Sequence, residues 1–162
     1  MPDFPRAMNV AITAERPDTP DAVALINELQ EHLESFYPPE SRHGFSVQKL
    51  IDQQVAFFVL RADGEPAGCG GIMFVGKEFG ELKRMYVRPR FRGVGFGRML
   101  VDRLAAHARH HGISRLRLET GVHQQEAIRL YERLGFKRIP PFPPYFEDPL
   151  SRCYEMRLEA ES

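Results

Sequence analysis

The sequence predicts a single α/β domain in which an antiparallel β-meander is followed by one strand–helix–strand unit. Three observations lead to this fold class. Short apolar runs separated by turn residues fill the first half, amphipathic helical patterns surround them, and a glycine-rich loop joins the third meander strand to a helix. At 162 residues, we expect one domain over residues 1–162, with a poorly ordered N-terminus over residues 1–8.

Each element rests on the residue spacing that is typical of it. A first strand at residues 9–13 precedes a helix that begins at Asp18–Pro20, where a capping residue is followed by proline, and ends before Pro38. Asp63-Gly64 predicts a hairpin turn, because both residues tolerate positive φ. The remaining elements are a short helix at 46–51, strands at 54–61, 66–75, 81–87, 115–121 and 153–159, and helices from Met99 to Gly112 and from Glu126 to Gly135.

Composition excludes several classes of protein. The 22 basic and 22 acidic residues balance, so net charge indicates neither a nucleic-acid partner nor an anionic membrane. No apolar run approaches the roughly 20 residues that cross a bilayer, and the N-terminus lacks a secretory core, which predicts a cytoplasmic protein. Cys69 and Cys153 lie in apolar stretches and are expected to be buried thiols. His107 and His111 share a helix face, but nothing nearby completes a metal-binding set.

The stretch "VRPRFRGVGFGR" is expected to bind an anion. A strand that runs through glycines into a helix leaves the first helical N–H groups without intrahelical acceptors and with a partial positive charge behind them. Glycines let the backbone close around an anion, and arginines add charge-assisted hydrogen bonds. Phosphate, and more specifically pyrophosphate, is the predicted ligand of this loop, whose glycines and flanking arginines are Gly93, Gly95, Gly97, Arg92 and Arg98.

Three other interpretations of the loop are less favoured. A plain turn requires one glycine and no arginine cluster. A P-loop requires Lys-Ser/Thr after its glycines, and neither follows here. A dinucleotide fingerprint requires a third glycine one residue later than Gly97; Glu119 imitates its acidic residue, but a single strand–helix–strand unit is too little for a doubly wound domain.

Two stretches resemble signatures of one enzyme family. "VRPRFRGVGFGRML" resembles the acyl-CoA pyrophosphate loop of the GCN5-related N-acetyltransferase (GNAT) family, whose pattern Arg/Gln-x-x-Gly-x-Gly/Ala is filled by Arg92, Gly95 and Gly97. A Val-x-Pro segment precedes it, as is customary in that family. "LRLETGVHQQEAIRLYERLGF" resembles the second signature, a strand and a helix ending Leu-Tyr-x-x-x-Gly-Phe. The order of elements is similar over residues 9–158.

The resemblance implies a fold and a cosubstrate. The fold is a mixed, mostly antiparallel sheet of about seven strands with about four flanking helices, in which two central parallel strands splay apart. The cosubstrate is acetyl-CoA, without a metal. The Met85 N–H would stabilise the oxyanion, Val87 would hold the pantetheine, and Gln124 stands where many relatives carry asparagine. The implied coenzyme A site comprises Met85, Tyr86, Val87, Arg92, Gly93, Val94, Gly95, Phe96, Gly97, Arg98 and Gln124.

The implied reaction is acetyl transfer to an amine, which requires a base and benefits from an acid. A primary amine near pKa 10 is mostly protonated at neutral pH, so a carboxylate must accept a proton before the nitrogen attacks. Glu81 and Glu119 each match the position of the base in one branch of the family. We favour Glu119 because it lies nearer the expected splay. Tyr131 matches the tyrosine that protonates the leaving thiolate.

The sequence says least about the identity of the acceptor amine. By resemblance, its pocket forms from "FYPPESRHGF" and "PPFPPYFEDPLS", whose aromatic residues are candidate walls: Tyr37, Phe142, Tyr145 and Phe146. His43 is a further candidate contact. A regular pleat would place Lys83 and Arg84 on opposite faces of their strand, so that at least one meets a substrate carboxylate.

These features predict N-acetylation of a small, amino-acid-like molecule. Two alternatives stay open: acetylation of protein N-termini or lysines, and a non-catalytic acyl-CoA-binding or sensor protein. Many relatives are dimers, which makes a homodimer an expectation here as well.

Overall fold

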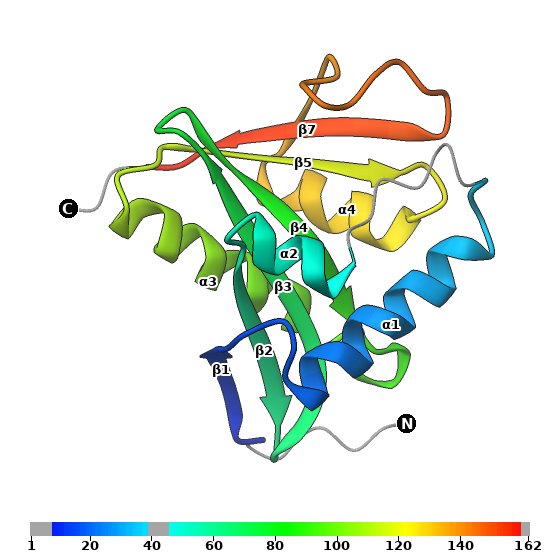
Figure 1. Ribbon diagram of the computed structural model, residues 1–162, viewed down its shortest axis with the longest axis vertical. Helices are drawn as coiled ribbons and strands as arrows, with labels where there is room; N and C mark the ends of the chain where they lie inside the picture. Colours follow the sequence, from blue (N-terminus) through cyan, green and yellow to red (C-terminus); the bar gives the residue numbers. More distant parts are fainter. Residues whose placement is uncertain (1–7, 39–45, 160–162) are drawn as a thin grey trace.

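A seven-stranded mixed sheet forms the centre of the computed structural model, which describes residues 8–38 and 46–159 (Figure 1). Its strand order is β1-β2-β3-β4-β5-β7-β6. Only the β4–β5 pair is parallel, and all the other neighbours are antiparallel. The strands are β1 Val10–Ala14, β2 Ala56–Ala62, β3 Glu65–Val75, β4 Phe79–Val87, β5 Arg115–Gly121, β6 Lys137–Ile139 and β7 Ser151–Arg157.

Helices cover both faces of the sheet. The first pair, α1 (Pro20–Glu34) and α2 (Val47–Asp52), lies on the near side in Figure 1, a side that we call the α1 face. The second pair, α3 (Phe96–His110) and α4 (Gln125–Leu134), packs on the opposite side, the α3 face. Strand residues alternate between the two cores: Phe57, Val59 and Cys69 belong to the α1 face, and Phe58, Ile72 and Leu116 to the α3 face.

Most expected elements are confirmed, and each has a local cause. Asp63 and Gly64 both have positive φ, 50° and 81°, as the predicted hairpin turn requires. Cys69 and Cys153 are buried free thiols, and burial raises their pKa values to about 12 and about 11. The three-residue strand β6 was not predicted. None of the helices within the described residues is both long and apolar enough to cross a membrane.

The central parallel strands separate shortly after they meet. Pairing between β4 and β5 covers only Gly80 with Leu116 and Glu81 with Arg117. Beyond Glu81, the register of β4 against β3 shifts between Cys69 and Gly71, which marks a β-bulge. The bulge lies at Arg84, whose φ is 52°. A bulge bends its strand, and here the bend coincides with the place where β4 leaves β5.

Small groups on β3 accommodate the bulge. Gly70 lies opposite it, and a Cβ atom at this position would overlap the Sδ of Met85. The Cys69 thiol donates a hydrogen bond to the Arg84 carbonyl oxygen, with a sulfur–oxygen distance of 3.3 Å. A larger residue at position 70 would therefore displace the Met85 side chain.

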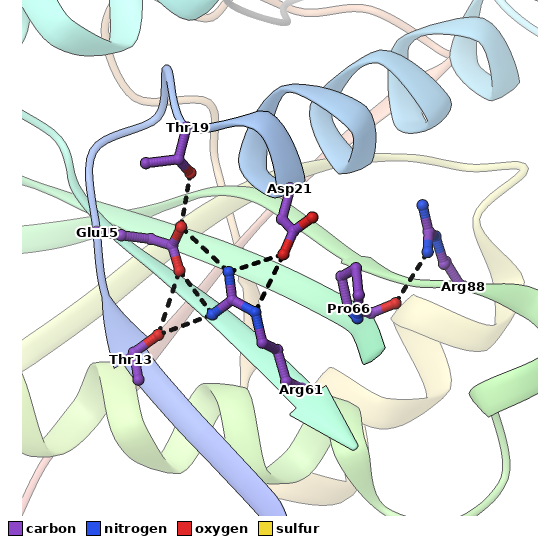
Figure 2. Close-up of polar contacts among 7 residues, drawn as sticks. All are labelled: Thr13, Glu15, Thr19, Asp21, Arg61, Pro66 and Arg88. Carbon is purple, nitrogen blue, oxygen red and sulfur yellow. Dashed lines mark hydrogen bonds and ion pairs between the residues drawn. The ribbon is translucent and has the colours of Figure 1, made fainter. Parts of the chain in front are cut away.

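A network of partly buried ion pairs connects the start of α1 to strand β2 of the sheet (Figure 2). Arg61 of β2 donates to Asp21 through Nε and Nη2, at 3.1 and 3.0 Å, and to Glu15 through Nη1 at 2.8 Å. The Thr19 hydroxyl donates to the other side of Glu15 at 2.6 Å. Beside this network, Arg88 donates to the carbonyl of Pro66, the register partner of Arg61, at 3.0 Å. Arg88 also donates to Glu28 of α1. The guanidinium groups thus fix α1 over β2 and β3.

Replacing Arg61 with methionine is expected to destabilise the protein by about 1–3 kcal/mol, because it leaves two partly buried carboxylates without their cation. Burial alone would raise the pKa of Glu15, but hydrogen bonds from Arg61 and Thr19 outweigh it and hold the pKa below 4.5. The loss is therefore full at neutral pH and fades as the pH falls through the pKa of Glu15. Urea unfolding at pH 7 and pH 3.5 measures both effects.

Arg16→Met is the matched control. Arg16 pairs with Asp18 on the surface, where the two side chains are 68% and 43% exposed, so its loss is expected to leave the free energy of unfolding nearly unchanged. Equal destabilisation by the two substitutions would contradict the role assigned to Arg61.

Candidate active site

The loop before α3 has the geometry of an anion-binding turn. Gly93 and Gly95 have φ values of 82° and 93°, a region that residues with a Cβ rarely adopt. Added Cβ atoms at both positions would meet nothing within 4 Å, so the glycines serve the backbone conformation and leave its surface open. Gly95 caps α3, and no side chain accepts from the first helical amides. These amides carry the positive end of the helix dipole.

Packing contacts with the core and with α4 hold the rest of the loop in place. The Phe96 side chain is buried against Phe91, so only its backbone amide faces the loop. A Cβ at Gly97 would lie 2.8 Å from a methyl group of Leu130, which shows that α3 and α4 approach closely at this residue. Arg92 donates through Nε to the Val87 carbonyl at 2.8 Å, while Val94 and Arg98 are exposed.

The segment of β4 beyond the bulge leads into this loop. The Met85 side chain packs into the cores on the α3 face, and the Tyr86 hydroxyl donates to Glu28 of α1 at 3.4 Å. Val87 pairs with Gly68 of β3, while the β4–β5 pairing has ended six residues earlier, at Glu81. Gln124 is the residue before α4, in the loop that follows β5. Its N–H donates to the Gly121 carbonyl at 3.0 Å.

A buried polar triad lies where β4 and β5 part. The Lys83 ammonium is 2.9 Å from the Glu81 carboxylate and 3.2 Å from the Tyr145 hydroxyl, and that hydroxyl donates to Glu81. Burial lowers the pKa of Lys83, and the negative charge of Glu81 opposes this change. Burial also raises the pKa of Tyr145, and the charges of Glu81 and Glu119 raise it further. The phenol is therefore neutral throughout the physiological range.

The expectation that Lys83 and Arg84 lie on opposite faces is wrong. Arg84 donates to the Gln30 side chain of α1 at 2.7 Å, so it lies on the α1 face. Lys83 also lies on that face, beside Glu81, whereas Leu82 packs into the α3-face core. The bulge is the reason, because an extra residue breaks the alternation of side chains at this point.

Glu119 faces the same side of the sheet from β5. Its carboxylate accepts a hydrogen bond from the Ser151 hydroxyl of β7 at 2.6 Å. It stands in register with Cys153, which lies in the cluster that Tyr145 also joins. Burial and Glu81 raise the pKa of Tyr145, and the charge of Glu119 raises it further. Burial lowers the pKa of Lys83, and the charges of Glu81 and Glu119 oppose that change. The two predicted carboxylates therefore flank the same point, one from each parted strand.

The remaining predicted residues occupy different environments. Tyr131 of α4 is buried with its ring edge against Phe136, and burial raises the pKa of its phenol. Tyr37 is buried beyond the end of α1, where its oxygen accepts from the His123 N–H at 2.8 Å. Phe142 is a core residue against Phe79, Phe146 is 56% exposed, and His43 lies outside the described residues.

Sequence reasoning missed several residues that shape the site. No motif marks Ser151, Gln30 or Gly121, which contact predicted residues from distant parts of the chain. Glu28 and Arg88 form a further missed pair, at 2.6 Å, which ties α1 to the end of β4. Across residues 8–38 and 46–159, no three His, Cys, Asp or Glu side chains are grouped so that they could hold a metal ion.

The parted parallel strands and the glycine loop define an acyl-CoA acyltransferase fold. A crystal structure from Klebsiella pneumoniae subsp. pneumoniae, described as an acyl-CoA N-acyltransferase, matches with a TM-score of 0.78 at 36% identity and covers 93% of this chain and 98% of its own. The PaiA N-acetyltransferase of Thermoplasma acidophilum, solved in complex with coenzyme A, shares the fold with a TM-score of 0.74 at 19% identity, over 93% of this chain and 99% of its own.

Sequence comparison identifies the family. The acetyltransferase (GNAT) family matches residues 24–136, and an IAA acetyltransferase from Azospirillum brasilense is 43% identical over 151 residues, which cover 93% of this chain and 99% of that protein. The chain belongs to the GNAT family and is an acetyl-CoA-dependent acetyltransferase.

Proposed function

We propose that this enzyme transfers the acetyl group of acetyl-CoA to the primary amine of a small molecule that carries a carboxylate. One observation carries the proposal: Glu81 and Lys83 of β4 and Glu119 of β5 all lie on the α1 face where the strands separate. An amine needs a nearby carboxylate to lose its proton, and a carboxylate-bearing substrate needs a cation. The site holds both kinds of group.

Coenzyme A is assigned to the loop before α3. The open surface over Gly93 and Gly95, together with first-turn amides that no side chain caps, suits a diphosphate. Arg92 and Arg98 add positive charge, and Arg92 is oriented by its hydrogen bond to the Val87 carbonyl. The thiol end would then extend along β4 toward the bulge, as an additional extended chain beside the parted strand.

Acetyl-CoA supplies a thioester, and the protein's part is to position the amine and handle protons. Glu119 accepts a proton from the ammonium, directly or through water, so that the nitrogen can attack the thioester carbonyl carbon. The Met85 N–H donates to the carbonyl oxygen as negative charge develops there. Tyr131 gives its proton to the sulfur as the carbon–sulfur bond breaks. The second proton of the attacking nitrogen leaves through water to the phenolate, so that an amide and the free thiol remain.

Glu119 suits the role of base better than Glu81. Glu81 is 1% exposed and lies in an ion pair with Lys83, which also engages Tyr145, so this carboxylate is held in a closed, charge-balanced group. Glu119 is only partly buried, and the Ser151 hydroxyl orients its carboxylate by a hydrogen bond. A partly exposed carboxylate can be reached by the ammonium group of an acceptor, whereas Glu81 is covered.

Tyr131 suits the role of acid. It lies on α4, the helix that packs against α3 through Gly97 and Leu130, and so close to the loop assigned to coenzyme A. Burial raises the pKa of the phenol, so the hydroxyl stays protonated over the whole working range, and the same shift makes it a weaker acid than an exposed tyrosine.

The acceptor is a small molecule in this proposal because its surroundings are close-packed. Buried Tyr37 and half-buried Tyr145 stand on either side of the carboxylates, and Arg84 provides a buried cation on the same face. Acetylation of a protein N-terminus or lysine remains the second candidate. A panel of free amino acids, other small amines and peptides, assayed by thiol release from acetyl-CoA, separates the two.

Glu119→Gln is expected to lower kcat/KM by about 100-fold to 1,000-fold at pH 7, because the amide cannot accept a proton from the ammonium. The wild-type kcat/KM falls as the pH drops below the pKa of the base, and this limb should disappear in the variant. Glu81→Gln is the matched control: it loosens the ion pair with Lys83 and lowers stability, but should lower kcat/KM by less than about tenfold. Wild-type turnover by Glu119→Gln across the pH range would remove Glu119 from the mechanism.

Tyr131→Phe is expected to lower kcat by about 10-fold to 100-fold and to leave the KM for acetyl-CoA within about twofold, because the hydroxyl acts on the leaving thiolate and not on cosubstrate binding. Steady-state kinetics with varied acetyl-CoA gives both constants. An unchanged kcat would show that another group protonates the sulfur.

A further inference from the structure

Helix α1 spans the gap between the parted strands on the acceptor side. At its middle, Gln30 accepts a hydrogen bond from Arg84 of β4 at 2.7 Å. Past its end, Tyr37 accepts from the N–H of His123, in the loop after β5, at 2.8 Å. Figure 1 shows α1 beginning near the lower ends of β2 and β3 and running past the end of β4 toward the loop that follows β5. The helix is thus anchored to both strands whose separation makes the site.

The contact with β5 depends on the absence of a side chain at Gly121. A Cβ on this residue would overlap the Tyr37 phenol, with the ring Cε1 only 2.8 Å away and the hydroxyl closer still. The backbone of Gly121 does not have positive φ, so conformation is not the reason for the glycine. Gly121 is therefore needed for close approach, and it is the residue that admits the Tyr37 ring.

Other contacts hold the ring in place. The Tyr37 N–H donates to the Leu33 carbonyl at 3.1 Å, which continues the turn of α1. The rings of Phe36 and Tyr37 lie 5.8 and 5.4 Å from the His123 ring. Burial raises the pKa of the Tyr37 phenol, and the charge of Glu119 adds to this effect, which places the phenol within the electrostatic reach of the proposed base.

We propose that Tyr37, seated on Gly121, is the residue that limits the size of the acceptor. This inference rests on the proposed function and narrows it to amines with a short side chain. Glu119 lies two residues before Gly121 on the same strand, so a ring fixed over Gly121 occupies the space that a branched or aromatic acceptor side chain would need beside the base. Tyr145 bounds the same region from the triad with Glu81 and Lys83.

The test compares kcat/KM for glycine, alanine, valine and phenylalanine as acceptors, measured by thiol release from acetyl-CoA. In Tyr37→Ala, the ratio of kcat/KM for phenylalanine to that for glycine is expected to rise at least tenfold. Gly121→Ala should raise the same ratio, because its methyl group displaces the ring. Gly121 accepts a hydrogen bond from Gln124 of the implied coenzyme A site, so a change in the KM for acetyl-CoA should be the same with all four amines, whereas the ratio of kcat/KM depends on the acceptor side chain.

Ser35→Ala is the control, since Ser35 is exposed at the end of α1 and its hydroxyl donates within that turn, to the His32 carbonyl. Its ratio should equal that of the wild type. A purely structural role of Tyr37 would lower kcat for all four amines in proportion, and this outcome overturns the inference. An unchanged ratio in Gly121→Ala also overturns the inference. This variant provides the test if Tyr37→Ala does not fold. If the wild type acetylates no amine at all, the proposed function fails and this inference falls with it.

Discussion

The separation of β4 from β5 beyond Glu81 is the constraint on which the rest of the structure depends. Two parallel strands that stayed paired would bury their backbone groups against each other and leave no room for a ligand between them. Here pairing stops after two residue pairs, and the bulge at Arg84 bends β4 away. The bend directs β4 toward the glycine loop. Glu81 and Glu119 lie on one face because Glu81 pairs with Arg117, and Glu119 follows Arg117 by two residues on β5.

The bulge also explains why charged side chains are buried at the site. It places Lys83 and Arg84 in succession on the α1 face, where Glu81 already lies. Buried charges are costly unless they are paired, and removal of one partner from such a pair typically costs about 3–5 kcal/mol. The ion pair of Lys83 with Glu81 and the hydrogen bonds of Tyr145 offset that cost. The same group fixes the loop before β7 against the sheet.

The order of the elements and the glycine loop could be predicted from the sequence, because both depend on local patterns. Apolar spacing marks α1 and α3, and Asp63-Gly64 marks its hairpin whatever the rest of the chain does. The short strand β6 could not be predicted, because three residues are too few to show an alternation of apolar and polar side chains. It forms by pairing with β7.

The parts of the site that could not be predicted depend on register and close approach. Ser151 reaches Glu119 because β5 and β7 pair in one register, which nothing in either strand specifies. Gly121 looks like an ordinary strand-end glycine until the position of Tyr37 is known. A regular pleat would place Lys83 and Arg84 on opposite faces, but the bulge, which no local pattern marks, places both on the α1 face.

Backbone amide exchange with and without coenzyme A tests the central claim most directly. If the parted strand and the loop before α3 hold the cosubstrate, the Met85 amide and those of residues 95–98 will exchange more slowly when coenzyme A is saturating. The amides of residues 110–112, at the other end of α3, will exchange as before. Binding detected by calorimetry with unchanged exchange at Met85 and at residues 95–98 would contradict the account.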